Sequence, residues 1–223
     1  MTRTISSPPE AEGGSPSQTR TLWLAMGLVG LGLGAALVAL LGPLAGGVIE
    51  YHVSEGARNQ VAGGDVAGLF LVAPVSLLAA LFVWRRHPAG PPLALPPAAY
   101  GLYMYSQLAL GGDVARYPGN SERFFPLYLG LFLLAGAIAV TAWPSIDAGR
   151  FLPRGVERTL GVFFLVVAGF LLLGLHLPGL LDAWSDQPTS TEYAADPVVF
   201  WLVKFMDLGI VVPLLVVSGV GLI

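Results

Sequence analysis

The chain has 223 residues, of which 55% are hydrophobic and only 11% are charged, against roughly 25% charged residues in an ordinary soluble domain. A net charge of −3 offers no basic surface for a nucleic acid. The absence of cysteine excludes a disulfide, a thiolate nucleophile, a cysteine-bound zinc and an iron–sulfur cluster.

Residues 1–20, rich in Ser, Pro, Gly and Glu, have the composition of a disordered cytoplasmic tail. The remainder, residues 21–223, holds six apolar runs of nearly the ~20 residues that cross ~30 Å of hydrocarbon. They cover about 21–48, 66–84, 93–110, 124–143, 159–181 and 197–223. The sequence therefore predicts an all-α membrane protein, a bundle of about six transmembrane helices. The third run is short and polar, so a re-entrant segment and a count of five stay open.

Arginines between the runs predict the orientation, because basic residues stay on the cytoplasmic side of a membrane. The tail and the even-numbered loops hold Arg3, Arg20, Arg85, Arg86, Arg150, Arg154 and Arg158, and the odd-numbered loops hold Arg58, Arg116 and Arg123. This majority predicts a protein of the plasma membrane with both termini in the cytoplasm. The three long acidic loops then lie outside the cell. The chain stops inside apolar sequence at Ile223, as a truncated sequence would.

Lys204 and Asp207 stand out in the last run, because ionisable side chains inside a membrane helix are costly unless they are paired or hydrated. Their spacing places them on one helical face. Counted from Pro197 at ~1.5 Å per residue, Asp207 lies about 15 Å deep. We expect a structural ion pair between the two side chains, and a ligand-binding or proton-relay carboxylate is the alternative.

Tyr100, Tyr103 and Gln107 form a polar stripe on one face of the third run. Because the third and sixth helices run in opposite directions, Tyr103 and Gln107 reach the depth of Asp207. This predicts an interhelical hydrogen-bond cluster, either as structural glue or as a binding site. Asp65 stands where the second run begins, and we expect it to cap that helix. A role for Asp65 in the outer vestibule is the alternative.

The three histidines do not share one membrane depth, because His176 lies near the outer end of the fifth run and His52 and His87 lie in loops on opposite sides. A bis-histidine haem or a three-ligand metal site needs converging ligands, so we expect no metal and no cofactor. His176 is interpreted as an interfacial polar residue. The sequence has no G-x-x-x-x-G-K-[ST], no H-E-x-x-H and no matched Ser/His pair. These absences disfavour an enzyme.

Gly30 and Gly34 form a G-x-x-x-G pair in the first run, a spacing that lets another helix backbone approach closely. Packing within the chain is one interpretation of this pair. A homo-oligomer, or a contact with a partner membrane protein, is the other.

The region from residue 62 to residue 223 resembles a group of poorly characterised six-helix bacterial and archaeal membrane proteins. The likeness lies in GGDVAGLFLVAPVSLLAALFVWRRH, AAYGLYMYSQLALGG, FFPLYLGLFLLAG and FMDLGIVVPLLVVSGV, with Phe125 and Tyr128 in an F-x-x-Y spacing. The chain departs from the group by the insertion DVARYPGNSER. The resemblance implies the six-helix topology and a further basic stretch beyond Ile223, and it implies no activity.

These patterns favour a non-enzymatic bundle for small-molecule transport or ligand binding, with a polar centre on the third and sixth helices. The first alternative is a structural or partner subunit that assembles through the Gly-rich first helix. The second is a membrane enzyme that uses the outer acidic loops. Beyond the lipid bilayer, the sequence identifies no ligand.

Overall fold

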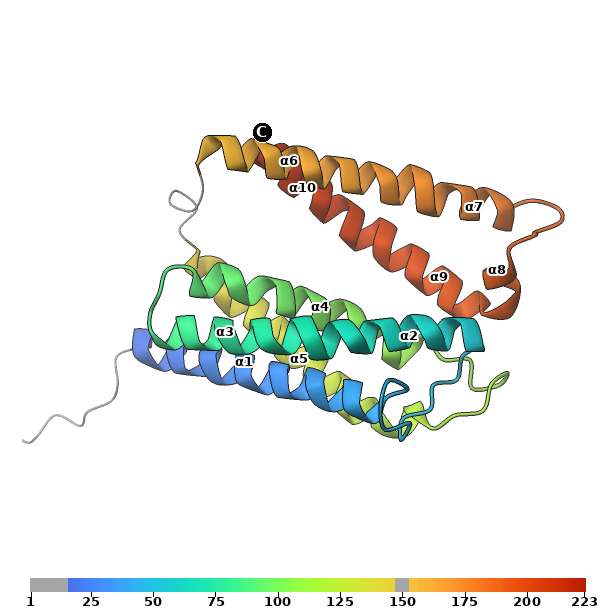
Figure 1. Ribbon diagram of the computed structural model, residues 1–223, viewed down its shortest axis with the longest axis horizontal. Coiled ribbons are helices and arrows are strands. Elements are labelled where there is room, and N and C mark those ends of the chain that lie inside the picture. The colour runs from blue at the N-terminus through green and yellow to red at the C-terminus, as the bar shows by residue number, and fades with distance from the viewer. Residues whose placement is uncertain (1–15, 147–152) are drawn as a thin grey trace, which may run out of the picture.

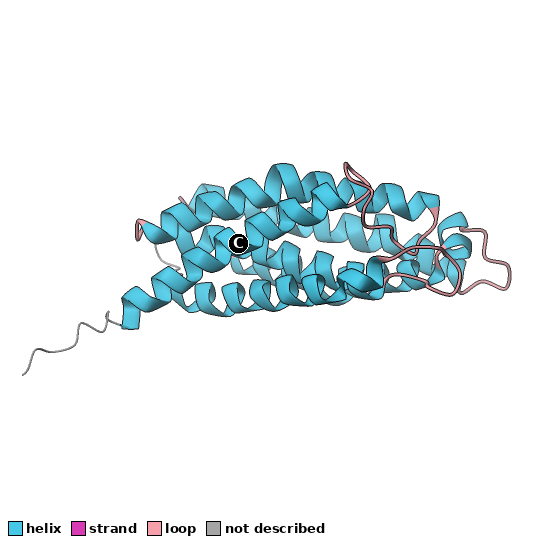
Figure 2. Cartoon of the chain, turned by 90° about the horizontal axis from the view of Figure 1, so that it is seen from below, coloured by secondary structure: helices cyan, strands magenta, loops and turns pink. Residues whose placement is uncertain are grey.

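The computed structural model describes residues 16–146 and 153–223, and these form helices without any strand (Figures 1 and 2). The all-α prediction is confirmed for them. The α-helices are α1 (Pro16–Leu41), α2 (Glu55–Ala67), α3 (Ala73–Trp84), α4 (Gly90–Leu110), α5 (Phe125–Ala142), α6 (Arg154–Gly169), α7 (Leu177–Ala183), α8 (Thr191–Ala195), α9 (Pro197–Met206) and α10 (Val212–Gly221). Three π-helical turns, η1 (Gly68–Val72), η4 (Phe170–His176) and η5 (Asp207–Val211), and two 3₁₀ turns, η2 (Ser121–Phe124) and η3 (Trp143–Ser145), adjoin them.

Five helical stretches of the described chain are long and apolar enough to cross a membrane. They are Gln18–Leu41, Glu55–Trp84, Ser121–Ser145, Arg154–Ala183 and Pro197–Gly221. The third predicted run is the one that is not among them, although α4 forms it as one continuous helix of 21 residues. Its tyrosines, Gln107 and prolines lower its apolarity. The predicted count of six is therefore five by this measure, the alternative that the sequence left open.

Three helix boundaries near the N-terminus differ from the prediction. α1 ends at Leu41 rather than near residue 48, because Gly42 and Pro43 follow and a residue before proline is disfavoured in the α conformation. α1 also begins at Pro16, so its first residues lie inside the predicted tail; residues 1–15 lie outside the described chain. α2 begins at Glu55, where the Ser54 side chain accepts a hydrogen bond from the Ala57 N–H at 3.3 Å.

Each of the three π-turns ends two residues before a proline. The residue before the proline donates to the carbonyl five positions back: Ala73 to Gly68, Leu177 to Leu172, and Val212 to Asp207. Proline has no N–H, and its ring clashes with the carbonyl four positions back in a regular α-helix. The wider π-turn removes that clash without interrupting the helix, as membrane helices commonly do.

The main core lies among α1, α3, α4 and α5, which pack side by side (Figure 1). Small residues allow close helix contact there, since a Cβ on Gly101 would lie 2.7 Å from Ala135. Gly30 and Gly34 face α5, where a Cβ on Gly34 would overlap the Leu131 side chain. In this structure the G-x-x-x-G pair therefore packs within the chain.

The last two long helices form a second layer against that core. The α6–α7 and α9–α10 helices cross each other, and Gly161 and Gly219 let the backbones of α6 and α10 meet (Figure 1). α9 also contacts α4, and η4 contacts η5. Their outer faces expose large apolar side chains, among them Phe163, Phe170 and Val217. Such contiguous apolar exposure is typical of a surface that contacts lipid or protein.

Candidate functional site

Asp207, the first residue of η5, connects two other helices. Tyr103 on α4 donates a hydrogen bond from Oη to Oδ1 of Asp207 at 2.6 Å. On the other side, Nε2 of His176, the last residue of η4, lies 2.9 Å from Oδ2. The carboxylate is therefore held between α4 and the α6–α7 helix. The depth argument from the sequence correctly brought Tyr103 to Asp207.

His176 is 1% exposed, and its contact with Asp207 has the distance of an ion pair but not the geometry of a hydrogen bond. Nδ1 also has no hydrogen-bond partner, so both ring nitrogens lack one among the described residues. Buried polar atoms without partners are uncommon in folded proteins, and each calls for an explanation. The structure places His176 inside the bundle, which corrects its interpretation as an interfacial residue.

The approach of His176 to Asp207 can be derived from the sequence. His176 lies seven residues before Ala183, where α7 ends, and Asp207 lies ten residues after Pro197, where α9 begins. At ~1.5 Å per residue these positions are only about 5 Å apart in depth. The pattern that identifies this pair is a histidine and a carboxylate at matching depth on neighbouring antiparallel helices, rather than two histidines or a histidine with a serine.

Lys204 is the only lysine of the chain and lies one turn before Asp207. Its side chain is 8% exposed and forms no ion pair within the described chain. Its Nζ lies over the Phe200 ring, 4.7 Å from the centroid, and a Cβ on Gly179 of α7 would lie 3.3 Å from it. The predicted Lys204–Asp207 ion pair is therefore absent, because Asp207 turns toward Tyr103 and His176 while Lys204 turns toward α7.

A cavity of about 590 Å³ lies between α2, η4, α8 and α9, and His176, Lys204 and Asp207 form part of its wall. Its outer part is acidic, since the exposed side chains of Glu55 and Glu192 also line it. The buried part of the wall thus carries the Lys204 ammonium, the His176 imidazole and the Asp207 carboxylate, and the exposed part carries two further carboxylates. This polarity suits a ligand with an anionic group at one end and hydrogen-bond donors at the other.

The other predicted site residues lie away from this cavity. Tyr100 donates a hydrogen bond to the Gly64 carbonyl at 2.8 Å, and Gln107 lines a different, smaller cavity. Asp65 is 2% exposed in the middle of the Glu55–Trp84 helix, so it does not cap a helix start and does not face an outer vestibule. The polar stripe of α4 therefore divides, and only Tyr103 reaches Asp207.

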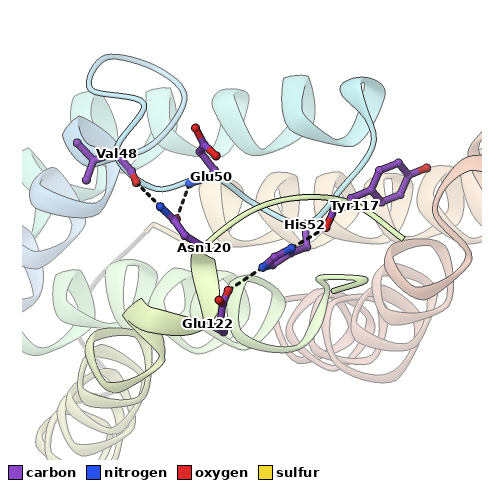
Figure 3. A network of polar contacts seen from close by, with 6 residues as sticks. All are labelled: Val48, Glu50, His52, Tyr117, Asn120 and Glu122. Atoms are coloured by element: carbon purple, nitrogen blue, oxygen red, sulfur yellow. Dashed lines mark hydrogen bonds and ion pairs between the residues drawn. The ribbon is translucent and has the colours of Figure 1, made fainter. Parts of the chain in front are cut away.

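The loops at one end of the molecule are joined through His52 (Figure 3). Its Nδ1 lies 2.7 Å from the Tyr117 carbonyl oxygen and its Nε2 lies 2.6 Å from a Glu122 carboxylate oxygen. Both partners are acceptors, so the imidazolium form, in which both nitrogens donate, satisfies both contacts. The hydrogen bond to the Tyr117 carbonyl, followed by that to Glu122, raises the pKa of His52 above its ordinary 6.5.

Asn120 adds two further contacts to this loop network. Its side-chain amide donates to the Val48 carbonyl and accepts from the Glu50 N–H, each at 2.9 Å (Figure 3). The residues that follow α1 are thereby fixed to the loop that precedes α5. The sequence identified this loop only as an insertion.

The insertion also holds the second helical layer in place. Arg116 donates from its guanidinium to the Ala194 carbonyl at 3.0 Å, and the Tyr117 hydroxyl donates to the Ala195 carbonyl at 2.7 Å. α8 forms one side of this cavity, through Thr191, Glu192 and Ala195. The insertion thus positions the wall of the candidate site.

Comparison with known proteins gives little homology. No family model matches the chain, and no solved structure matches it. A curated ribose 1,5-bisphosphate phosphokinase of Chromobacterium violaceum is 28% identical over 153 residues, which cover 63% of this chain and 72% of that protein. Identity at this level does not place the chain in that enzyme's family. The resemblance to a six-helix membrane group stays a prediction.

This relative corrects the function expected from the sequence. It is named as a phosphokinase of a sugar phosphate, an enzyme, whereas the sequence favoured a non-enzymatic transport or ligand-binding bundle. That expectation is withdrawn, together with its two alternatives, the partner subunit and the enzyme of the outer loops. The histidine, lysine and carboxylate that could support chemistry meet instead inside the helical layers.

Proposed function

We propose that this protein is an enzyme that performs acid–base chemistry on a phosphorylated polyol. The observation that carries the proposal is Lys204, a buried cation with no anionic partner in the described chain, which shares a cavity with the His176–Asp207 pair. An uncompensated charge in such a place is unfavourable by several kcal/mol. A phosphate group of a substrate would supply the missing negative charge.

The three polar groups take separate roles in this proposal. Lys204 binds the phosphate group through its ammonium. The imidazole of His176 accepts a proton from a substrate hydroxyl, and the adjacent carboxylate of Asp207 stabilises the imidazolium that results. Tyr103 donates to Asp207 and fixes its orientation. A positioned acid–base pair of this kind contributes typically 10²–10⁴-fold to a rate.

The acidic end of the cavity orients the substrate. Glu55 and Glu192 are exposed, and Gln60, which donates to Glu192 at 3.3 Å, lies beside them. Carboxylates accept hydrogen bonds from the hydroxyl groups of a polyol, and they repel a phosphate placed among them. The phosphate is therefore favoured at Lys204 and the hydroxyl groups at the mouth.

The relative supports the substrate class and no more. Its name specifies a sugar that carries phosphate groups, and the cavity has a cation for a phosphate and acceptors for hydroxyl groups. From that name we take the phosphorylated sugar as a substrate class. The proposal contains no phosphokinase step, since neither end of the cavity is built from the glycine-rich loop that cradles nucleotide phosphates.

The sole lysine makes the proposal directly testable. In protein labelled with ¹⁵N-lysine, the Nζ signal of Lys204 should shift saturably with ribose 5-phosphate and should not shift with ribose. Calorimetry should show that Lys204→Met loses this binding, whereas Arg58→Met, an exposed cation on α2, keeps it. Unchanged ribose 5-phosphate binding by Lys204→Met would refute the phosphate site.

Catalysis needs a readout that does not presuppose the product. ³¹P NMR of protein incubated with ribose 5-phosphate or ribose 1,5-bisphosphate should show a new phosphorus signal. Asp207→Asn and His176→Gln should each abolish that signal while the Lys204 Nζ shift on binding remains. Binding without any new signal in wild-type protein would reject the enzymatic role for these substrates.

We further propose that the helices span the plasma membrane with both termini in the cytoplasm. The five long apolar helices and their exposed outer faces support this, as does Figure 1, in which α1 begins and the chain ends at the same end of the bundle. A cysteine placed beside Arg86 in this cysteine-free chain tests the orientation. It should resist a membrane-impermeant thiol reagent in intact cells and react after lysis.

A further inference from the structure

A groove of about 340 Å³ lies between α1 and α5, and it shares no residue with the cavity of the candidate site. Its walls come from these two helices alone, and Gly27 and Ala137 are small enough to leave room in it. The remaining lining is apolar apart from Thr141, whose hydroxyl already donates to the Ala137 carbonyl, and the indole N–H of Trp23. An engineered apolar cavity of ~150 Å³ binds benzene, so this groove has room for a substantial length of an acyl chain.

A cation lies at one end of the groove. Arg20 donates a hydrogen bond from its guanidinium to the Thr141 carbonyl at 2.7 Å, and Thr141 belongs to the groove lining. The Arg20 side chain is exposed and forms no ion pair within the described chain. Because a guanidinium carries five N–H donors, one hydrogen bond to a carbonyl fixes its position and leaves other donors for an anion.

Exposed tryptophans lie at the same end of the two helices. Trp23 is 67% exposed, one turn after Arg20, and Trp143 is 70% exposed, two residues after Thr141. Tryptophan is enriched where membrane proteins meet the lipid headgroups. Gly27 lies seven residues further along α1 than Arg20, about 10 Å deeper at ~1.5 Å per residue. The groove therefore extends from the headgroup level into the hydrocarbon.

We infer that this groove binds one acidic phospholipid, with an acyl chain along Gly27 and the phosphate hydrogen-bonded to Arg20. A phosphate and a guanidinium form strong, charge-assisted hydrogen bonds. The leaflet rests on the proposed membrane orientation, in which this end faces the cytoplasm, where anionic lipids attract Lys and Arg. The site itself rests on the groove and on Arg20, and it is independent of the proposed enzymatic activity.

Two lipids with the same acyl chains test the inference. Detergent-solubilised protein is titrated with palmitoyl-oleoyl phosphatidylglycerol, which is anionic, or with the zwitterionic phosphatidylcholine. Native mass spectrometry then gives the affinity for the first bound lipid. Wild-type protein should prefer the anionic lipid by roughly fivefold, the factor that one arginine near a membrane surface contributes.

A pair of arginine variants tests the role of the charge. Arg20→Gln should lose the preference for phosphatidylglycerol. Arg158→Gln is the matched control, because it also removes one exposed cation, from α6, and it should keep the preference. Both side chains are exposed, and thermal unfolding in the same detergent shows that each variant is folded.

A pair of glycine variants tests the acyl-chain contact. Gly27→Leu fills part of the groove, since a Cβ on Gly27 already lies in contact with Ile138 at 3.4 Å. It should weaken the binding of both lipids by roughly fourfold or more, the factor that one lost buried CH₂ contributes. Gly130→Leu should bind both as the wild type does, because a Cβ there meets nothing within 4 Å and Gly130 does not line the groove.

Three outcomes would overturn the inference. Equal affinity of wild-type protein for both lipids would show that the groove selects an acyl chain alone. A preference that persists in Arg20→Gln would place the acidic lipid at another cation, and unchanged binding by Gly27→Leu would place its chain outside the groove.

Lys204→Met separates this site from the proposed enzymatic one. This variant should lose ribose 5-phosphate and keep the preference for phosphatidylglycerol. Loss of both would also overturn the inference, because the phosphoglycerol headgroup would then occupy the candidate site. The leaflet is checked independently by the cysteine beside Arg86.

Discussion

The Tyr103 hydroxyl donates a 2.6 Å hydrogen bond to the Asp207 carboxylate and joins positions 104 residues apart in the sequence. It connects the core layer, through α4, to the second helical layer, through η5. The bond is charge-assisted, and such bonds are shorter and stronger than neutral ones. The same contact therefore supports both the packing of the two layers and the orientation of the acid–base pair.

Removing this hydroxyl should lower stability. Tyr103→Phe leaves Oδ1 of Asp207 without its donor, at a cost of roughly 1.5–3 kcal/mol for a hydrogen bond to a charged group. Thermal or denaturant unfolding in detergent measures the loss. Tyr193→Phe is the control, because the Tyr193 ring packs against Phe200 and its hydroxyl makes no hydrogen bond within the described chain. An equal effect of the two changes would show that the Tyr103 bond contributes nothing specific.

Gly179 and Gly169 offer a matched test of the phosphate site. A Cβ on Gly179 would lie 3.3 Å from the Lys204 Nζ, whereas a Cβ on Gly169 would meet nothing within 4 Å. Both substitutions to alanine favour the helix by about 0.5–1 kcal/mol. Gly179→Ala should weaken ribose 5-phosphate binding by roughly three- to tenfold, through displacement of the ammonium. Gly169→Ala should bind as the wild type does, and calorimetry on both variants decides.

The loop network should weaken as the pH rises. The folded-state pKa of His52 lies above its ordinary 6.5, so its contribution is fully present below about pH 6.5 and is lost as the pH rises through the folded-state value. Glu122 is half-exposed, so solvent screening keeps the effect small. Hydrogen exchange of residues 113–122, followed from pH 5.5 to 8.5, should accelerate beyond the intrinsic rate.

The control for this pH dependence is His52→Gln. A glutamine cannot gain a proton in this range, so the excess acceleration should disappear and the loop should exchange fast at every pH. A wild-type loop whose protection is constant across the range would contradict the assignment of an imidazolium to His52.

The insertion should control the mobility of α8. Tyr117→Phe removes the hydrogen bond to the Ala195 carbonyl, and a bond of this kind contributes about 0.5–1.5 kcal/mol. Hydrogen exchange in Thr191–Ala195 should therefore accelerate by roughly two- to tenfold. Exchange in α4, which the insertion follows, should stay unchanged. Acceleration throughout the protein would indicate general destabilisation instead of a local tether.

The helical architecture followed from hydropathy, because apolar runs of membrane length leave few alternatives. The approach of Tyr103 to Asp207 followed from depth along antiparallel helices. Helix starts are harder to predict: Ser54 caps α2 well outside the apolar run, so the prediction that Asp65 caps this helix is wrong, and Asp65 lies in mid-helix. Apolarity marks where a helix would meet lipid, and capping chemistry marks where it begins.

The candidate site could be predicted from the sequence only in part, because its geometry depends on which side chains neighbouring helices present. Lys204 and Asp207 share a helical face by spacing, yet each turns to a different neighbour. His176 required a comparison between the fifth and sixth runs at matching depth. The contact between the insertion and α8 could not be predicted from the sequence, because the acceptors that Arg116 and Tyr117 meet are backbone carbonyls.

The π-turns before Pro74, Pro178 and Pro213 have a consequence for comparing this chain with others. A π-turn accommodates one more residue than an α-turn, so the helix beyond it is rotated by about 100° relative to an uninterrupted helix. In each helix that contains one of these π-turns, the apolar periodicity before the turn is therefore out of phase with the periodicity after it. A relative that lacks one of these prolines is expected to align with a one-residue gap inside the helix, and the position of that gap would mark where η1, η4 or η5 has closed.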